Sequence, residues 1–173
     1  KDGSLWIGTL SRGLCKFNSK TGHFKNYRFD PIQVDSPERA KLLAELPFTF
    51  SYLNYYTIRS IFEDSFGTLW IGTFGGGLYK FDREKEKFIH YPFSFDKKND
   101  LAYNIMAITE TIQDGISTLW LGTYGGGLVR FTENEGFSYF KHDSTGNRSI
   151  SDNRIIAIYP DTCQGENSIW IGT

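Results

Sequence analysis

Short apolar runs, separated by polar turns and glycines, recur along the chain at a spacing of tens of residues. The clearest phrase is LWIGTFGGGLYKF at residues 69–81, and LWLGTYGGGLVRF repeats it at 119–131. Residues 5–17 read LWIGTLSRGLCKF, and residues 169–173 read IWIGT. A period of this size is typical of repeat architectures. The chain is therefore expected to be a series of similar structural units.

Each unit is expected to form four short strands. In the second unit they are predicted at 57–62, 69–73, 78–81 and 88–91, which are rich in β-branched and aromatic residues. Turn residues separate the first two strands, and the triplet GGG separates the second from the third. Four-stranded antiparallel units of this length are typical of the blades of a β-propeller. The second strands of successive units are predicted at 5–9, 69–73, 119–123 and 169–173.

The sequence thus predicts an all-β fold in which residues 1–173 form part of a β-propeller. About three four-stranded antiparallel blades are expected, plus part of another. The innermost strands are predicted at 57–62, 104–109 and 154–159, lining one axis. These runs are apolar without strict alternation, as expected of strands that are packed on both faces. Since the chain begins inside one repeat and ends inside another, the remaining blades are expected from a longer parent chain.

An insertion at residues 30–56 lengthens the first unit. Within it, Ser36 and Pro37 suit the start of a helix, and residues 40–46 are good helix formers, so one short helix is predicted. In a propeller this connection emerges on the face around the mouth of the central channel, as do the loops between second and third strands.

Residues that recur in every unit are expected to be structural, because stacked repeats share one packing scheme. Asp64, Asp114 and Asp161 are expected to cap turns through side-chain hydrogen bonds to the backbone. The other recurring residues are the tryptophans and the glycine triplets: Trp6, Trp70, Trp120, Trp170, Gly75, Gly76, Gly77, Gly125, Gly126 and Gly127.

Residues found in only one unit are the candidates for ligand binding. Five are aromatics of the insertion, which could stack on sugar rings or could pack the insertion onto its blade: Phe48, Phe50, Tyr52, Tyr55 and Tyr56. Arg12 occupies the place of a loop glycine and offers planar donors for a carboxylate or sulfate, or is a solvated charge. Arg59 interrupts an apolar inner strand, where an internal salt bridge is favoured over a ligand contact.

Composition and charge narrow the function classes. The chain has 39% hydrophobic and 17% aromatic residues and a net charge of −1, which provides no general attraction for nucleic acid. No apolar run is long enough for a membrane segment within these residues. The three histidines lack the spacing of a zinc site, and Cys15 and Cys163 stand singly, so no metal, cofactor or catalytic residue is predicted.

The pattern D-x-x-G-x-L-W-I-G-T-x-G-G-G-L-x-x-F, matched from Asp64 through Phe81, resembles the two-component regulator propeller repeat. In that family such repeats form seven-bladed propellers in the periplasmic sensor region of hybrid histidine kinases. The resemblance implies an oligosaccharide ligand, as in Bacteroides-type members, and a parent protein with a membrane helix and a cytoplasmic kinase.

The predicted function is therefore a ligand-sensing, oligosaccharide-binding, periplasmic propeller domain of a two-component signal transduction regulator, without enzymatic activity of its own. Its expected partners are the oligosaccharide, the other blades of the parent chain, and a second copy in a homodimer. Two alternatives remain open at this stage. A glycan-active hydrolase or lyase would need paired carboxylates at the channel mouth, and a protein-interaction scaffold could use the same propeller face.

Overall fold

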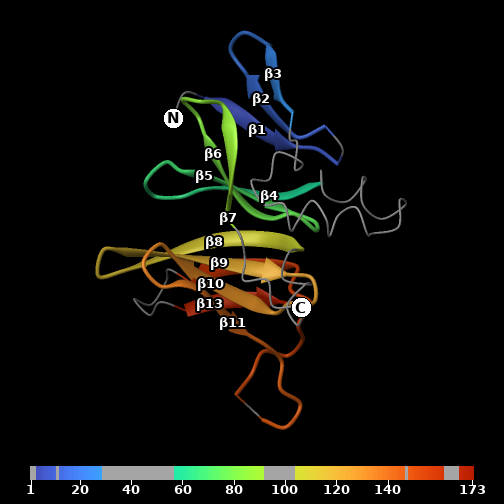
Figure 1. Ribbon diagram of the computed structural model, residues 1–173, viewed down its shortest axis with the longest axis vertical. Helices are drawn as coiled ribbons and strands as arrows, with labels where there is room; N and C mark the ends of the chain where they lie inside the picture. Colours follow the sequence, from blue (N-terminus) through green and yellow to red (C-terminus); the bar gives the residue numbers. More distant parts are fainter. Residues whose placement is uncertain (1–2, 11, 29–56, 92–103, 147, 162–167) are drawn as a thin grey trace, which may run out of the picture.

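The computed structural model describes residues 3–10, 12–28, 57–91, 104–146, 148–161 and 168–173. In these residues the secondary structure is β throughout, with thirteen strands arranged in four antiparallel sheets (Figure 1). Within each sheet, every strand pairs with the next strand of that sheet along the chain, so every sheet is a simple meander.

The four sheets follow one another along the sequence. The first contains β1 (Ser4–Gly8), β2 (Leu14–Asn18) and β3 (Phe24–Tyr27). The second contains β4 (Ile58–Glu63), β5 (Leu69–Thr73), β6 (Gly77–Asp82) and β7 (Lys87–Tyr91). The third contains β8 (Ile105–Gln113), β9 (Ile116–Thr123), β10 (Leu128–Thr132) and β11 (Gly136–Phe140). The last contains β12 (Ala157–Asp161) and β13 (Ser168–Gly172).

This arrangement confirms the predicted all-β fold of antiparallel blade units. Two sheets have four strands, and a three-stranded and a two-stranded sheet flank them. The predicted innermost strands correspond to β4, β8 and β12, and β8 contacts both of the others. The last of them starts at Ala157, because Arg154 makes only an isolated bridge, to Tyr124. The insertion at 30–56 and its predicted helix lie outside the described residues.

Neighbouring sheets pack through an aromatic triplet that recurs with the repeat. Trp70 of β5 contacts Tyr91 of its own sheet and Phe131 of the next, with ring centroids 5.1 and 5.8 Å away. Trp6 makes the same pair of contacts, with Tyr27 at 5.8 Å and Phe81 of the second sheet at 5.5 Å. Trp6 and Trp70 therefore lie between sheets.

The depth of burial of the tryptophans depends on whether a following sheet is present. Trp70 is 3% exposed and belongs to the core between the second and third sheets, whereas Trp170 on β13 is 67% exposed. A large aromatic ring is buried where a second sheet covers it, and β13 is the last strand described, so no described strand follows to cover Trp170.

The turn between second and third strands explains the threonine that ends each LWIGT phrase. Thr73 Oγ1 donates a hydrogen bond of 2.9 Å to the Gly77 carbonyl, and Thr123 Oγ1 donates one of 2.7 Å to the Gly127 carbonyl. Gly77 has φ +80° and Gly127 has φ +83°, a left-handed conformation that glycine adopts without strain. The triplet thus allows a tight turn that the threonine closes.

The third sheet departs from the repeat at its first turn. Strands β8 and β9 extend into a long hairpin with Asp114 at φ +53° and Gly115 at φ +76°. Two residues with positive φ form a type I′ turn, for which Asp-Gly is a preferred sequence. The expectation that Asp114 caps this turn as Asp64 does is therefore wrong, because the added strand residues place Asp114 at the tip of the hairpin.

Candidate functional site

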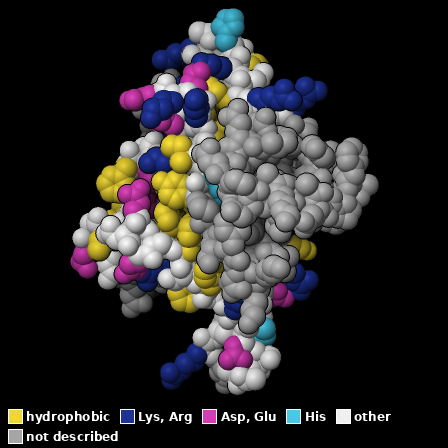
Figure 2. All heavy atoms as spheres, in the orientation of Figure 1, with side chains coloured by type: hydrophobic (Ala, Val, Ile, Leu, Met, Phe, Trp, Pro, Cys, Tyr) yellow, Lys and Arg dark blue, Asp and Glu magenta, His cyan; other side chains and the backbone are white. Residues whose placement is uncertain are grey.

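Because neighbouring strands run in opposite directions, the turns of every sheet lie at its two opposite strand ends, which are called the hairpin edge and the mouth edge below. The hairpin edge carries the turns between first and second strands and between third and fourth strands, including 64–68 and 133–135. The mouth edge carries the turns between second and third strands, at 9–10 with 12–13, at 74–76 and at 124–127, together with residues 141–146 and 148–156. In Figure 1 the hairpin edge lies on the left, where the β8–β9 hairpin projects. Figure 2 shows hydrophobic side chains gathered on that side of the molecule.

The two candidate arginines both lie at the mouth edge. Arg12 is exposed, and its backbone N–H donates a hydrogen bond of 3.0 Å to Thr9 Oγ1. Arg59 is also exposed, which corrects the expectation of an internal salt bridge, and its guanidinium lies 5.6 Å from the ring centre of Phe74. A charge on β4 that faces solvent needs no buried partner. The candidate aromatics Phe48, Phe50, Tyr52, Tyr55 and Tyr56 lie outside the described residues.

A second charged group at the mouth edge was not predicted. Arg154 donates to Asp152 through Nη2 at 2.8 Å and Nε at 3.2 Å. These bonds, with the Arg154 backbone N–H, lower the pKa of Asp152 to about 2. The Asn153 carbonyl accepts hydrogen bonds from the backbone of Gly125 at 2.9 Å and Gly127 at 3.0 Å. Backbone bonds therefore fasten this connection to the neighbouring turn.

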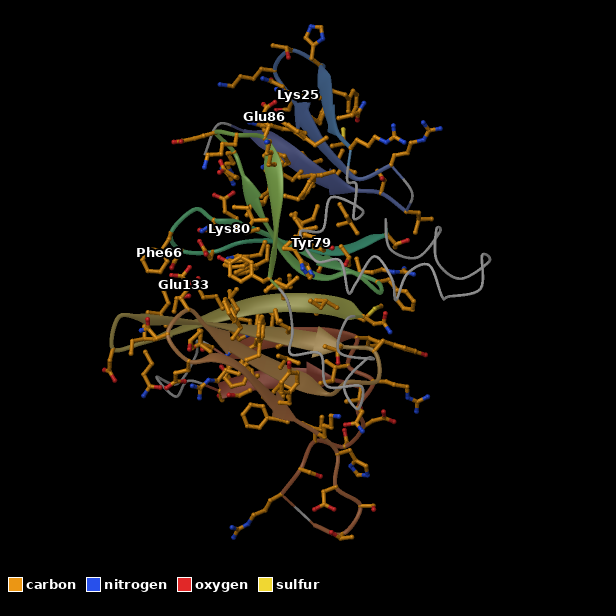
Figure 3. The ribbon with its side chains drawn as sticks, in the orientation of Figure 1. Lys25, Phe66, Tyr79, Lys80, Glu86 and Glu133 are labelled. Carbon is orange, nitrogen blue, oxygen red and sulfur yellow. The ribbon has the colours of Figure 1, made fainter. Side chains whose placement is uncertain are left out.

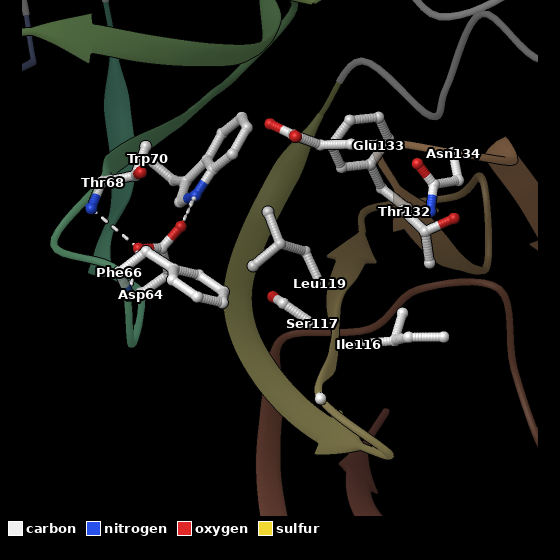
Figure 4. A pocket seen from close by; sticks show the side chains of 12 residues that line it. Asp64, Phe66, Thr68, Trp70, Ile116, Ser117, Leu119, Thr132, Glu133 and Asn134 are labelled. Atoms are coloured by element: carbon white, nitrogen blue, oxygen red, sulfur yellow. Dashed lines mark hydrogen bonds between the residues drawn. The ribbon is translucent and has the colours of Figure 1, made fainter.

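A pocket of about 380 Å³ opens at the hairpin edge between the second and third sheets (Figure 4). Its walls come from the β4–β5 turn, the β8–β9 hairpin and the β10–β11 turn. The lining residues are Asp64, Phe66, Thr68, Trp70, Gly115, Ile116, Ser117, Leu119, Phe131, Thr132, Glu133 and Asn134.

The inner part of the pocket is apolar, and the Asp64 carboxylate fixes the position of the tryptophan in its wall. Trp70, Leu119 and Phe131 are all at most 5% exposed. Asp64 accepts a hydrogen bond of 2.7 Å from Trp70 Nε1 with one oxygen, while the other accepts from the backbone of Thr68 at 2.7 Å and Phe66 at 3.0 Å. Because these bonds occupy both oxygens, Asp64 orders the pocket and is a poor candidate for a reacting group.

The rim of the pocket combines exposed apolar and polar side chains. Phe66 is 73% exposed and Ile116 is 54% exposed, while Glu133 and Asn134 also face solvent. The pKa of Tyr91 is raised, first by burial and then by the negative charge of Glu133. The Phe66 ring and the Glu133 carboxylate at this rim are groups that can bind a ligand. Hydrolysis would require, in addition, an acid and a base positioned against the bond that is cleaved.

The pocket was not predicted, although two residues signalled it. Phe66 is the only aromatic residue in the turns that precede second strands, and Glu133 stands where the second unit has Arg83. Neither position looks unusual until the sheets are stacked, because each lies in a polar turn.

The described residues contain no group of three or more His, Cys, Asp or Glu side chains that could hold a metal ion. Of the other candidate ligands, Cys15 is buried, His90 Nε2 lies 3.2 Å from the Gly76 carbonyl, and His142 Nδ1 lies 2.8 Å from the Ile150 carbonyl. No helix within the described ranges is long and apolar enough to cross a membrane.

Sequence comparison adds a family to this geometry. Residues 52–75 match the family model described as two component regulator propeller. The chain carries the two component regulator propeller repeat. No curated protein has significant sequence similarity to this propeller chain.

Several solved structures share the fold. The propeller chain superposes on the extracellular domain named as that of the hybrid two component system BT4673 from B. thetaiotaomicron, with a TM-score of 0.68 and 24% identity, covering 100% of this chain and 19% of that one. For the corresponding domain of BT3049 from the same organism the TM-score is 0.51 and the identity 22%, covering 98% of this chain and 24% of that one. For PorZ, a surface component of the type-IX secretion system of Porphyromonas gingivalis, the TM-score is 0.57 and the identity 18%, covering 98% of this chain and 22% of that one. The chain thus spans about a fifth of the length of these structures.

Proposed function

We propose that this chain is part of the extracytoplasmic ligand-sensing propeller of a two-component signal transduction regulator. The observation that carries the proposal is the regulator propeller repeat at residues 52–75, together with the superposition of the whole chain on the extracellular domain of BT4673. One structure of that domain is named for a hybrid two component system and another for a one component system. A periplasmic location and attachment to the inner membrane through a longer parent chain are part of the same proposal.

The ligand proposed for this sensor is an oligosaccharide, bound at the mouth edge. Two exposed groups there could contact a sugar. They are the Arg59 guanidinium, which lies over the Phe74 ring, and Tyr124, which is 44% exposed. The insertion at 30–56, which leads into β4, would add the aromatics Tyr52 and Tyr55. Aromatic rings bind the apolar faces of sugars, and arginine binds the carboxylates of uronic acids.

A binding screen tests this function. The intact protein that contains these residues is titrated with a panel of glycan fragments, and reducing ends are measured in the same samples. Saturable binding without new reducing ends supports the sensor. Turnover would instead indicate a glycan-active enzyme, and absence of binding across the panel would favour an interaction scaffold.

Point variants then test the location of the ligand. Tyr52→Ala and Tyr55→Ala should each weaken binding by about 1–3 kcal/mol if the rings stack on sugars. Melting temperature is measured beside affinity, with Phe66→Ala at the hairpin edge as the matched loss of an exposed aromatic. Variants that unfold the protein, or a loss of affinity in Phe66→Ala alone, would contradict a site at the mouth edge.

A further inference from the structure

At the interface between the first and second sheets, an arginine side chain fills the space over Trp6. Arg83, in the β6–β7 turn, places its guanidinium 5.6 Å from the ring centre of Trp6. The same side chain pairs with Glu63 of β4, with Nη2 and Oε2 2.9 Å apart. Lys16 of the first sheet also lies near this ring, at 5.4 Å. Cation–π attraction and the ion pair together hold Arg83 over the tryptophan.

The interface between the second and third sheets has the same framework but a different charge. Trp70 corresponds to Trp6, and Lys80, 6.0 Å from the Trp70 ring, corresponds to Lys16. Glu110 corresponds to Glu63, since each lies five residues after the first residue of its strand. Two residues after Phe81 comes Arg83, whereas two residues after Phe131 comes Glu133. A carboxylate therefore replaces the guanidinium.

The other carboxylate of this interface is already engaged. Glu110 Oε1 accepts hydrogen bonds from Ser117 Oγ at 2.6 Å and Ser65 Oγ at 3.0 Å, and Oε2 accepts one from the Ser65 backbone at 2.8 Å. The two acids cannot pair with each other as Arg83 and Glu63 do, so Glu110 ties the β4–β5 turn to β9 instead.

The space left by this exchange is the pocket of about 380 Å³. Figure 3 shows Phe66 and Glu133 facing each other from the second and third sheets at the hairpin edge. In Figure 4 the Glu133 side chain points toward Trp70. Asp64, Glu110 and Glu133 give the pocket and its margin a negative character, which Lys80 balances only in part.

We propose that this pocket binds the guanidinium or primary ammonium group of an external ligand, which takes the place that Arg83 occupies one interface earlier. The carboxylate of Glu133 supplies the counter-charge, and the rings of Phe66 and Trp70 supply aromatic surface. A charge-assisted hydrogen bond beside an aromatic ring is a strong recognition element for an organic cation. The proposal does not rest on the oligosaccharide function, because it concerns the opposite edge of the sheets.

Calorimetric titration of the intact protein with matched probes tests the proposal. N-acetyl-arginine amide is compared with its neutral isostere N-acetyl-citrulline amide, and glucosamine is compared with N-acetylglucosamine. Both cations should bind more tightly than their neutral partners. A preference for the arginine probe would identify a peptide side chain as the source of the cation, and a preference for glucosamine would identify an amino sugar.

Two variants of Glu133 and one control complete the test. Glu133→Gln should weaken cation binding by about tenfold or more, the range expected for loss of a hydrogen bond to a charged group. Glu133→Arg should recreate the arrangement of Arg83, abolish binding and leave the melting temperature unchanged or higher. Glu84→Gln removes an exposed carboxylate from the equivalent turn of the second sheet and should leave affinity unchanged.

Three results would overturn the proposal. They are equal affinity for charged and neutral probes, unchanged affinity in Glu133→Gln, and no binding of either cation by the folded protein. Tyr52→Ala and Tyr55→Ala change the insertion and Glu133→Gln changes the hairpin-edge pocket, so these variants distinguish failure of one proposal from failure of the other.

Discussion

Gly72 in β5 lies so close to Ile105 in β8 that a Cβ atom built on the glycine would be 2.6 Å from the isoleucine Cγ2. The same approach occurs at the preceding interface, where a Cβ on Gly8 would lie 2.5 Å from Ile58 Cγ2. At these two interfaces the glycine of the LWIGT phrase is thus needed because the first strand of the next sheet packs directly onto it.

Gly122→Ala should destabilise the protein by about 1–3 kcal/mol, the usual cost of forcing one extra methyl group into a packed core. A Cβ at this position would lie 2.6 Å from Ile155 Cγ2 and 3.2 Å from Ile158 Cδ1. The free energy of unfolding, measured by urea titration of the 173-residue chain, checks this. Gly172→Ala is the matched control, since its nearest atom would be Ala157 Cβ at 3.5 Å, and it should change stability by less than about 0.5 kcal/mol. Equal effects at the two sites would contradict the packing argument.

Trp70→Ala should cost about 3–5 kcal/mol, as for truncation of a buried large aromatic residue. The ring is 3% exposed and contacts two other aromatic rings, whereas Trp170 at the corresponding position is 67% exposed. Trp170→Ala in the same chain should therefore cost less than about 1 kcal/mol. Urea unfolding followed by circular dichroism measures both. A small effect of Trp70→Ala would show that the tryptophan does not hold the sheets together.

Asp64→Asn should destabilise by about 1–3 kcal/mol, because the single amide oxygen cannot accept both the Trp70 Nε1–H bond and the backbone bonds that Asp64 receives on its other oxygen. Asp114→Asn should be neutral or slightly stabilising, since Asn-Gly is a preferred type I′ sequence and Asn tolerates the φ of +53° found there. Melting temperatures of the two variants, each compared with the parent chain, provide the test. Matching losses would mean that both aspartates cap their turns alike.

Asp152 should titrate at a pKa of about 2, below its ordinary value of 3.8, because Arg154 stabilises the charged carboxylate. A lowered folded-state pKa means that this stabilisation is present above the unfolded value near 3.8 and is lost as the pH falls through about 2. Carboxyl carbon NMR, recorded from pH 5 to pH 1.5, measures the pKa. In Arg154→Ala it should return toward the ordinary value, and a persistently low pKa would exclude the arginine as its cause.

The placement of the strands could be read largely from the sequence. Predicted second strands at 69–73 and 119–123 compare with β5 at Leu69–Thr73 and β9 at Ile116–Thr123. Strand propensity and turn residues act locally, and repetition shows the same signal several times. The long β8–β9 hairpin was missed, although Asp114-Gly115 is itself a local signal for a two-residue turn.

The candidate pocket could not be predicted from the sequence in the same way. The rule that unique residues carry function selected Arg12 and Arg59, both of which lie exposed at the mouth edge. It passed over Phe66 and Glu133, which lie in polar turns about seventy residues apart and line one pocket. Their meeting depends on the packing of the second sheet against the third, and no feature within either turn records it.

By itself, the sequence determined the period, the strand order and the residues that would lie between sheets, because these follow from local propensity and from repetition. Only the tertiary structure decided which glycines lie against a neighbouring isoleucine, how deeply each tryptophan is buried, and where the pocket opens. Those properties arise from contacts between sheets, in which one residue has different consequences according to what the next sheet places opposite it. Arg83 covers Trp6 and its counterpart Glu133 leaves a pocket beside Trp70, because charge complementarity is a property of the pair across the interface.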